Sequence, residues 1–216
     1  RFINKENMRG HMISSPVARM LRCCAAAGTA ILGLYVAPAW AAGAMVTGGL
    51  TSQPVGHYEF CKTYPGECSI RPSNLAPIKM TPALWRKLTT ITVKVNAAVK
   101  PMSDKDIYGK DEVWAYPDKG AGDCEDYVLE KRRELSRSGI SLADLLITVL
   151  RKPDGEGHAV LTVRTDKGDY VLDNLTDKVK AWNETDYRFL KRQAIDNTGR
   201  WVSIREGQQV LVGAVK

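Results

Sequence analysis

A glycine-rich turn leads directly into a helix with a cysteine in its first turn, and this stretch, Gly120 to Lys131, constrains the chain more than any other. Asp123 is suited to cap the helix, which places Cys124 at the first helical position. There the thiol faces unpaired backbone N–H groups and the positive end of the helix dipole, and both favour the nucleophilic thiolate. Helical periodicity directs three apolar side chains toward a core: Val128, Leu129 and Leu135.

The composition is that of one globular domain, with 216 residues, 44% hydrophobic and 25% charged. The net charge is +7, but the first 41 residues hold five basic residues and one acidic residue, which is +4 of that total. Only +3 is left for the other residues, and they contain no basic stripe interleaved with aromatic side chains. We therefore expect no nucleic-acid partner.

Residues 1–41 have the pattern of an export signal. Arg19 and Arg22 precede an apolar run over residues 23–37, and Ala39-Trp40-Ala41 supplies a small-x-small cleavage site. We expect cleavage after Ala41, with residues 1–19 as a candidate upstream extension. The run is short for a membrane span, so no stable membrane insertion is expected, with a retained anchor as the alternative. The mature protein is then expected to be periplasmic or secreted.

The cysteines fit an exported protein. Cys23 and Cys24 leave with the signal, and three cysteines stay in the mature chain. Cys61 and Cys68 flank a turn-rich loop, and a bridge between them would close about eight residues and stabilise the fold by about 2.5 kcal/mol. The alternatives are a reduced buried pair or a metal pair. Cys124 is left as the unpaired thiol, in a position that suits reactivity.

The pattern along the chain predicts an α+β domain, with helices first and strands second. Residues 42–57 are rich in Gly, Ala and Thr, which indicates a flexible leader. Residues 58–205 form the expected domain, and residues 206–216 form a C-terminal tail.

Within the domain, Thr81-Pro82 opens a helix that ends near Pro101. Residues 145–150 are a continuous apolar run of strand length, which predicts a buried central strand. Residues 187–199 are mixed, typical of a short strand or helix, and residues 200–205 indicate a last strand.

Two apolar runs separated by Thr-Asp-Lys-Gly predict a hairpin. A two- or four-residue loop sets Arg164 opposite Asp169, and His158 and Asp173 then become diagonal neighbours on one face. A three-residue loop would place them on opposite faces. The other face is expected to pack on the core through Ala159, Leu161, Val163, Tyr170 and Leu172.

Cys124, His158 and Asp173 together provide a nucleophile, a base and a group that orients the base. The other histidines, His11 and His57, fall in segments expected to be cleaved or loosely attached, which leaves His158 as the candidate base. The alternative is that the three residues have ordinary structural roles, with the cysteine buried and inert.

Three motifs resemble those of the bacterial transglutaminase-like cysteine peptidases. They are Gly122-Asp-Cys-Glu-Asp-Tyr127, Gly157-His-Ala-Val-Leu161 and Gly168-Asp-Tyr-Val-Leu-Asp-Asn174, and the likeness covers roughly residues 58–205. The resemblance implies a papain-like, transglutaminase-type fold, with N-terminal helices packed on an antiparallel sheet. It also implies a catalytic triad of Cys124, His158 and Asp173. The implied substrate is a surface or periplasmic protein such as a cell-surface adhesin, and a membrane-bound regulator is an implied partner.

Three carboxylates surround the cysteine, those of Asp123, Glu125 and Asp126, and their charge opposes the thiolate. The resemblance implies a calcium ion beside the cysteine, with Asp123 and Glu125 as its ligands. Oxygen ligands of this kind suit calcium. The alternative is acidic capping of the helix, which needs no metal.

The expected activity is acyl transfer. The Cys124 thiolate attacks a carbonyl, backbone N–H groups hold the oxyanion, His158 protonates the leaving amine, and water releases the acyl enzyme. An amine in place of water would make the protein a transglutaminase or amidase. A non-enzymatic exported binding module with the same fold is the alternative from another class.

Overall fold

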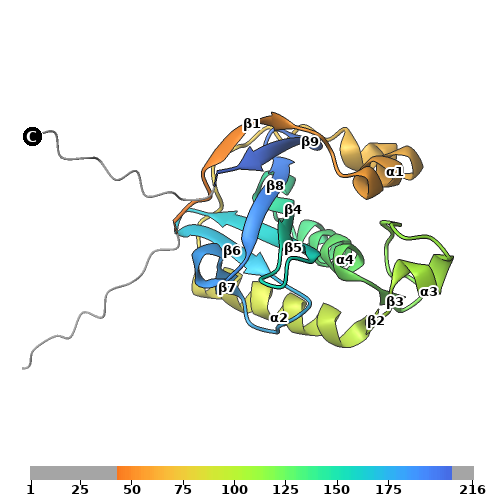
Figure 1. Cartoon of the computed structure of the whole chain (residues 1–216). Coiled ribbons are helices and arrows are strands. Elements are labelled where there is room, and N and C mark those ends of the chain that lie inside the picture. Colours follow the sequence, from red (N-terminus) through yellow and green to blue (C-terminus); the bar gives the residue numbers. More distant parts are fainter. Residues whose placement is uncertain (1–42, 206–216) are drawn as a thin grey trace, which may run out of the picture. The chain divides into compact units, whose positions relative to one another are not determined.

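The computed structural model describes residues 43–205, so the predicted signal (1–41) and tail (206–216) lie outside the described residues. The fold is α+β, as predicted: helices cover an antiparallel sheet (Figure 1). The main helices are α1 (Val55–Thr63), α2 (Pro82–Ala98) and α4 (Cys124–Arg137), with a short α3 (Asp104–Tyr108) between the last two. Among residues 43–205, no helix is both long and apolar enough to cross a membrane.

The main sheet has seven strands in the order β1-β9-β8-β4-β5-β6-β7, and all of its neighbouring pairs are antiparallel. The predicted central strand is β4, which lies between β8 and β5. The mixed region after residue 187 contains β8. The strand bounds are β1 Thr47–Thr51, β4 Leu145–Arg151, β5 Gly157–Thr165, β6 Gly168–Leu172, β7 Lys180–Ala181, β8 Arg188–Ala194 and β9 Asn197–Ile204.

The helix α2 begins and ends as its sequence predicts. The Thr81 side chain accepts a hydrogen bond from the Leu84 backbone N–H at 3.0 Å, and Pro82 occupies the first helical position. Its apolar stripe packs with α4 and one face of the sheet in the larger core, which contains the core-facing hairpin residues named above. A smaller apolar cluster on Val160 and Val171 covers the opposite face of the hairpin.

The predicted flexible leader, residues 42–57, differs from the structure. Thr47–Thr51 form strand β1, which pairs with β9 at the edge of the main sheet, and α1 begins at Val55. The sheet domain therefore starts before residue 58. Gly- and Thr-rich composition indicated looseness, but the partner of β1 is about 150 residues away in sequence and is invisible to a local pattern.

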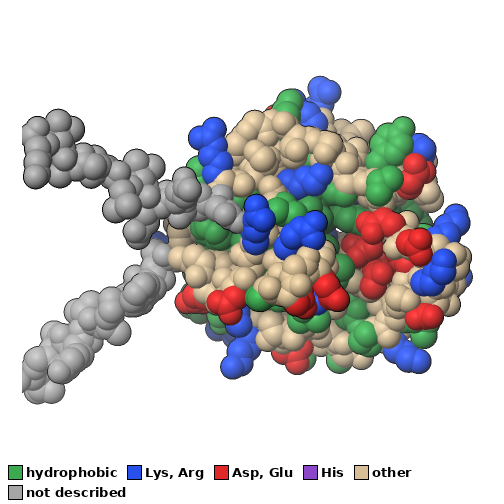
Figure 2. All heavy atoms as spheres, in the orientation of Figure 1, with side chains coloured by type: hydrophobic (Ala, Val, Ile, Leu, Met, Phe, Trp, Pro, Cys, Tyr) green, Lys and Arg blue, Asp and Glu red, His purple; other side chains and the backbone are tan. Residues whose placement is uncertain are grey.

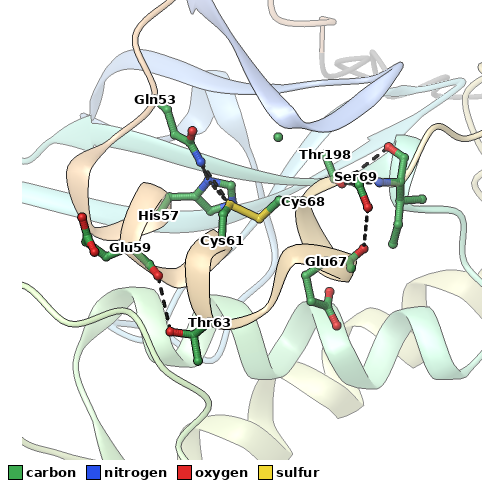
Figure 3. Close-up of a disulfide and its surroundings, with 12 residues drawn as sticks. Gln53, His57, Glu59, Cys61, Thr63, Glu67, Cys68, Ser69 and Thr198 are labelled. Carbon is green, nitrogen blue, oxygen red and sulfur yellow. Dashed lines mark hydrogen bonds between the residues drawn. A yellow bond between two sulfur atoms is a disulfide. The ribbon is translucent and has the colours of Figure 1, made fainter.

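The predicted bridge between Cys61 and Cys68 is present and ties α1 to the short 3-10 helix Pro65–Cys68 (Figure 3). His57, expected to be loose, is 1% exposed and lies beside this disulfide. Its ring packs edge-on against Trp114 and Trp201, with ring centroids 5.4 and 5.3 Å away. His57 is therefore a core residue that docks α1 on the sheet.

A second, two-stranded parallel sheet positions the loop in front of α4. Its strands are β2 (Lys100–Pro101) and β3 (Ala121–Gly122), so the chain that leaves α2 is paired with the turn before Cys124. Gly120 begins this turn at φ +79°, a left-handed conformation that glycine adopts without strain. The cysteine is thus fixed from both sides, by β3 before it and by α4 after it.

Candidate active site

A cavity of about 310 Å³ brings together the candidate cysteine and histidine. Cys124 comes from the start of α4 and His158 from the start of β5, while Lys191 of β8 and Pro54 contribute further walls. Trp114, which precedes the glycine turn, also lines the cavity. Figure 2 shows acidic side chains gathered on the right of the view, around a hollow between the positions of α1 and α3 in Figure 1.

Cys124 occupies the first position of α4, with Asp123 as the N-cap residue, as predicted. The Asp123 side chain makes no capping hydrogen bond. Gly122 packs tightly against Asp126, because a Cβ added to Gly122 would lie 2.5 Å from Asp126 Oδ2. Asp126 in turn accepts a hydrogen bond from the Ala115 backbone N–H at 2.8 Å. The Gly-Asp-Cys-Glu-Asp sequence therefore folds as one packed unit.

The environment of the thiol differs from the expectation of a stabilised thiolate. Cys124 donates a hydrogen bond to Glu125 Oε2 at 3.0 Å. Burial, and then the negative charge of Glu125, raise the pKa of the Cys124 thiol. The Ala159 backbone N–H, next to His158, opposes this rise. Burial and the charge of Glu125 outweigh the helix end, so the pKa of the Cys124 thiol lies above its ordinary value, and positive charge beside it would favour the thiolate.

His158 and Asp173 form a buried pair, with His158 Nε2 and Asp173 Oδ1 2.8 Å apart. The hairpin register is the predicted one, because Arg164 lies opposite Asp169 and a two-residue loop joins the strands. Burial alone would raise the pKa of Asp173. Two effects outweigh burial: the hydrogen bond and charge of His158, and the hydrogen bonds from Tyr187 and the Leu175 backbone. The pKa of Asp173 is therefore below its ordinary value.

Tyr187 was not singled out by sequence reasoning. Its hydroxyl donates to Asp173 Oδ2 at 2.6 Å. It follows a loop with no periodic pattern, so its proximity to the hairpin comes only from the tertiary fold. A tyrosine near a strand start is typical of core packing, and no local signal distinguishes the two roles.

Asp104, Asp123 and Glu125 each place a carboxylate oxygen within 4.8 Å of the other two. Within the described part of the chain, Asp104 Oδ1 and Asp123 Oδ1 are buried and have no hydrogen-bond partner. Burial, and then the charge of Asp123, raise the pKa of Glu125 to about 9, while burial raises that of Asp104 to about 6. Sequence reasoning chose Asp123 and Glu125 but missed Asp104, which lies in α3, about 20 residues earlier.

The fold and the cavity define a papain-like arrangement, in which a cysteine at a helix start faces a histidine-bearing strand. Residues 47–209 match the family described as bacterial transglutaminase-like cysteine proteinase. The chain belongs to this family, and it is a transglutaminase-like cysteine peptidase.

Solved structures of LapG from Legionella pneumophila are similar to this chain. The first has a TM-score of 0.47 and 24% identity, and the match covers 57% of this chain and 71% of LapG. A calcium-bound form has a TM-score of 0.48 and 24% identity, and the match covers 62% of this chain and 77% of LapG. An EGTA-treated form has a TM-score of 0.47 and 23% identity, and the match covers 61% of this chain and 76% of LapG. A search of curated proteins gives no significant match.

Proposed function

We propose that the protein is an exported cysteine peptidase in which Cys124, His158 and Asp173 form the catalytic triad. The observation that carries this proposal is the buried His158–Asp173 pair, whose His158 lines the same cavity as Cys124. A hydrolase of this kind needs a nucleophile, a base and an orienting group around one space where a carbonyl can sit. The family membership supports the same class of chemistry.

The hydrogen bonds assign the roles of the two histidine nitrogens. An ionised carboxylate only accepts hydrogen bonds, so His158 Nε2 carries a proton and donates a hydrogen bond to Asp173 Oδ1. Nδ1 is then free to take the thiol proton and to return it to the leaving amine. Attack by the sulfur forms an acyl enzyme, and water attacks this intermediate to release the acid and restore the thiol. The Cys124 backbone N–H at the helix start is suited to hold the oxyanion.

A calcium ion fits the cluster of Asp104, Asp123 and Glu125. The donors are all carboxylate oxygens, two of them buried and without a partner, and oxygen ligands are those that calcium prefers. These three residues would hold the ion, which would supply positive charge beside the thiol when bound. The chain's own contribution is to keep the carboxylates together in a buried site, where burial, and then the charge of Asp123, raise the pKa of Glu125.

The proposed substrate is a protein outside the cytoplasm, such as a cell-surface adhesin, and the proposed location is periplasmic or secreted. The export pattern of residues 1–41 supports this location, and the Cys61–Cys68 bridge supports an oxidising compartment. A membrane-bound regulator is the proposed partner, on the basis of the sequence resemblance.

The test combines trapping of the thiol with a search for cleavage. Iodoacetamide labelling of Cys124, followed by intact mass, is expected to be fast near neutral pH in calcium and slower in His158→Ala. A proteome-derived peptide library read by mass spectrometry is expected to show cuts that disappear in Cys124→Ala. Library peptides joined to an added amine would indicate transamidation instead.

An unreactive thiol and an uncut library in calcium would overturn the proposed catalytic triad and favour a binding module with the same fold. For the calcium site, EGTA is expected to lower both the labelling rate and the melting temperature of the wild type. An Asp104→Asn/Asp123→Asn double variant is expected to show neither response. Identical melting of the wild type with and without EGTA would contradict the calcium proposal.

A further inference from the structure

Tyr187 is the one side chain on the Asp173 carboxylate to which the proposed mechanism gives no role. Its hydroxyl donates to Asp173 Oδ2 at 2.6 Å, while Oδ1 accepts from His158 Nε2 at 2.8 Å. The two carboxylate oxygens are thus held by two different side chains. The Leu175 backbone N–H, 3.0 Å from Oδ1, adds a contact from the loop that follows the strand.

We propose that Tyr187 is a positioning residue of the catalytic site: its hydroxyl fixes the rotation of the Asp173 carboxylate and thereby the orientation of His158. The inference rests on the proposed triad and adds a fourth residue to it. The terminal torsion of an aspartate is broad and soft, so hydrogen bonds on Oδ1 alone leave Oδ2 free to move as the carboxylate turns. A second bond on Oδ2 removes this freedom.

The aromatic ring of Tyr187 also contacts the imidazole. The ring centroids of Tyr187 and His158 are 5.8 Å apart at an interplanar angle of 66°, and Phe189 supports Tyr187 with a centroid distance of 6.4 Å. This edge-on packing restrains the imidazole from a side that the hydrogen bond to Asp173 does not cover. The hydroxyl and the ring therefore restrain Asp173 and His158, respectively.

A second cavity, of about 150 Å³, makes the hydroxyl necessary. Asp173 and Tyr187 both line it, whereas Cys124 lines the other cavity. Without the hydroxyl, water in this second cavity could reach Oδ2 and compete for the carboxylate. The remaining charged side chains on its walls are Lys178, Lys180, Glu184 and Asp186.

The charges around Asp173 predict the direction of a pH effect. Lys131 of α4 is buried, and Asp173 and Asp177 are its charged neighbours. The hydrogen bonds from His158 and Tyr187 favour the ionised form of Asp173. Loss of the Tyr187 hydroxyl removes one of these bonds while the Lys131 charge stays, so the pKa of Asp173 rises and the carboxylate is protonated at a higher pH than in the wild type.

The deciding experiment compares Tyr187→Phe with Tyr127→Phe. Tyr127 donates a hydrogen bond of the same length, 2.6 Å, to the Val99 carbonyl, so each variant removes one tyrosine hydroxyl bond, buried for Tyr127 and partly buried for Tyr187. A fluorogenic peptide built from a cleaved library sequence is the substrate. For Tyr187→Phe, we expect kcat to fall about tenfold with KM nearly unchanged, and the acid limb of the kcat profile to move to higher pH. For Tyr127→Phe, we expect lower stability but the wild-type acid limb.

A third variant separates the hydroxyl from the packing of the ring. If the hydroxyl positions Asp173, Tyr187→Phe and Tyr187→Leu both lose activity, and nitrogen NMR shows faster solvent exchange of the His158 Nε2 proton in Tyr187→Phe. If only packing matters, Tyr187→Phe keeps the wild-type kcat, acid limb and proton exchange, and the proposal is wrong even though Cys124→Ala is inactive. Cleavage that persists in Cys124→Ala overturns the proposed triad itself.

Discussion

At the scale of single residues, Gly122 determines how closely the turn before the nucleophile can pack. An added Cβ would lie 2.5 Å from Asp126 Oδ2 and 2.6 Å from Asp126 Cβ, in a turn held on both sides. We expect Gly122→Ala to lower the free energy of unfolding by about 1–3 kcal/mol, because either Asp126 or the start of α4 must shift. Urea unfolding measures this change, and iodoacetamide labelling shows whether Cys124 moves.

Gly66→Ala is the matched control, because a Cβ there would meet nothing within 4 Å. Its unfolding curve is expected to stay within about 0.5 kcal/mol of the wild type. Equal stability of the two variants would show that the Gly122 turn relaxes freely, contrary to the packing described above.

Residues of the candidate site differ in how well their positions can be predicted from the sequence. Cys124 could be placed from a helix-start pattern, and the His158–Asp173 pairing from the register of a hairpin, since both depend on nearby residues. Asp104 and Tyr187 could not, because the tertiary fold brings them to the site from separate segments. The raised pKa of the Cys124 thiol was missed for another reason: burial and Glu125 outweigh the helix dipole, and burial cannot be read from spacing alone.

At the scale of secondary-structure elements, α4 is notable for a buried cation. Lys131 lies two turns after Cys124 with 0% exposure, and its Nζ has no hydrogen-bond partner among residues 43–205. Burial lowers the pKa of Lys131 to about 8, while the charges of Asp173 and Asp177 oppose the shift. The charge therefore costs stability at neutral pH but favours the ionised form of Asp173.

We expect Lys131→Met to raise the free energy of unfolding at pH 7 by about 1–3 kcal/mol and to lower activity. In the wild type, Lys131 is protonated in the unfolded chain but not in the folded one between pH 8 and 10.5. Lys131 therefore makes the free energy of unfolding rise with pH across that window. The variant lacks this contribution. Lys94→Met, which removes an exposed lysine paired with Glu134, is the control, and its free energy of unfolding is expected to stay close to that of the wild type. A destabilised Lys131→Met would contradict the cost assigned to the buried charge.

Elements with a strong local signal could be predicted, and those defined by distant partners could not. The helix α2 has a cap, a proline at its first position and a regular apolar stripe, and β4 is a continuous apolar run. Strand β1 has none of these signals. It is Gly- and Thr-rich, and it forms a strand because its backbone pairs with β9. The leader prediction failed there because strand pairing overrides composition.

At the scale of the whole molecule, His57 joins three parts of the chain: α1, the segment before the glycine turn, and β9. The Trp201 indole N–H donates to His57 Nδ1 at 3.3 Å, and the Trp114 ring packs edge-on against the imidazole. Burial, and then the charge of Arg132, lower the pKa of His57 to about 3. The domain is therefore built around a histidine that must stay neutral.

This requirement predicts acid sensitivity. Between pH 6.5 and about 3, the unfolded chain binds a proton at His57 and the folded chain does not. The free energy of unfolding therefore falls as the pH falls through this window. Above pH 6.5, His57 makes no contribution to the pH dependence of stability. The slope is about 1.4 kcal/mol per pH unit for one group. We expect His57→Gln, which removes the titration and keeps a polar side chain, to be less stable than the wild type at pH 7.5 but to lose less stability from pH 6 to pH 4. Urea unfolding at each pH measures both curves. Parallel curves would mean that the folded domain binds a proton at His57 as readily as the unfolded chain does, contrary to this prediction.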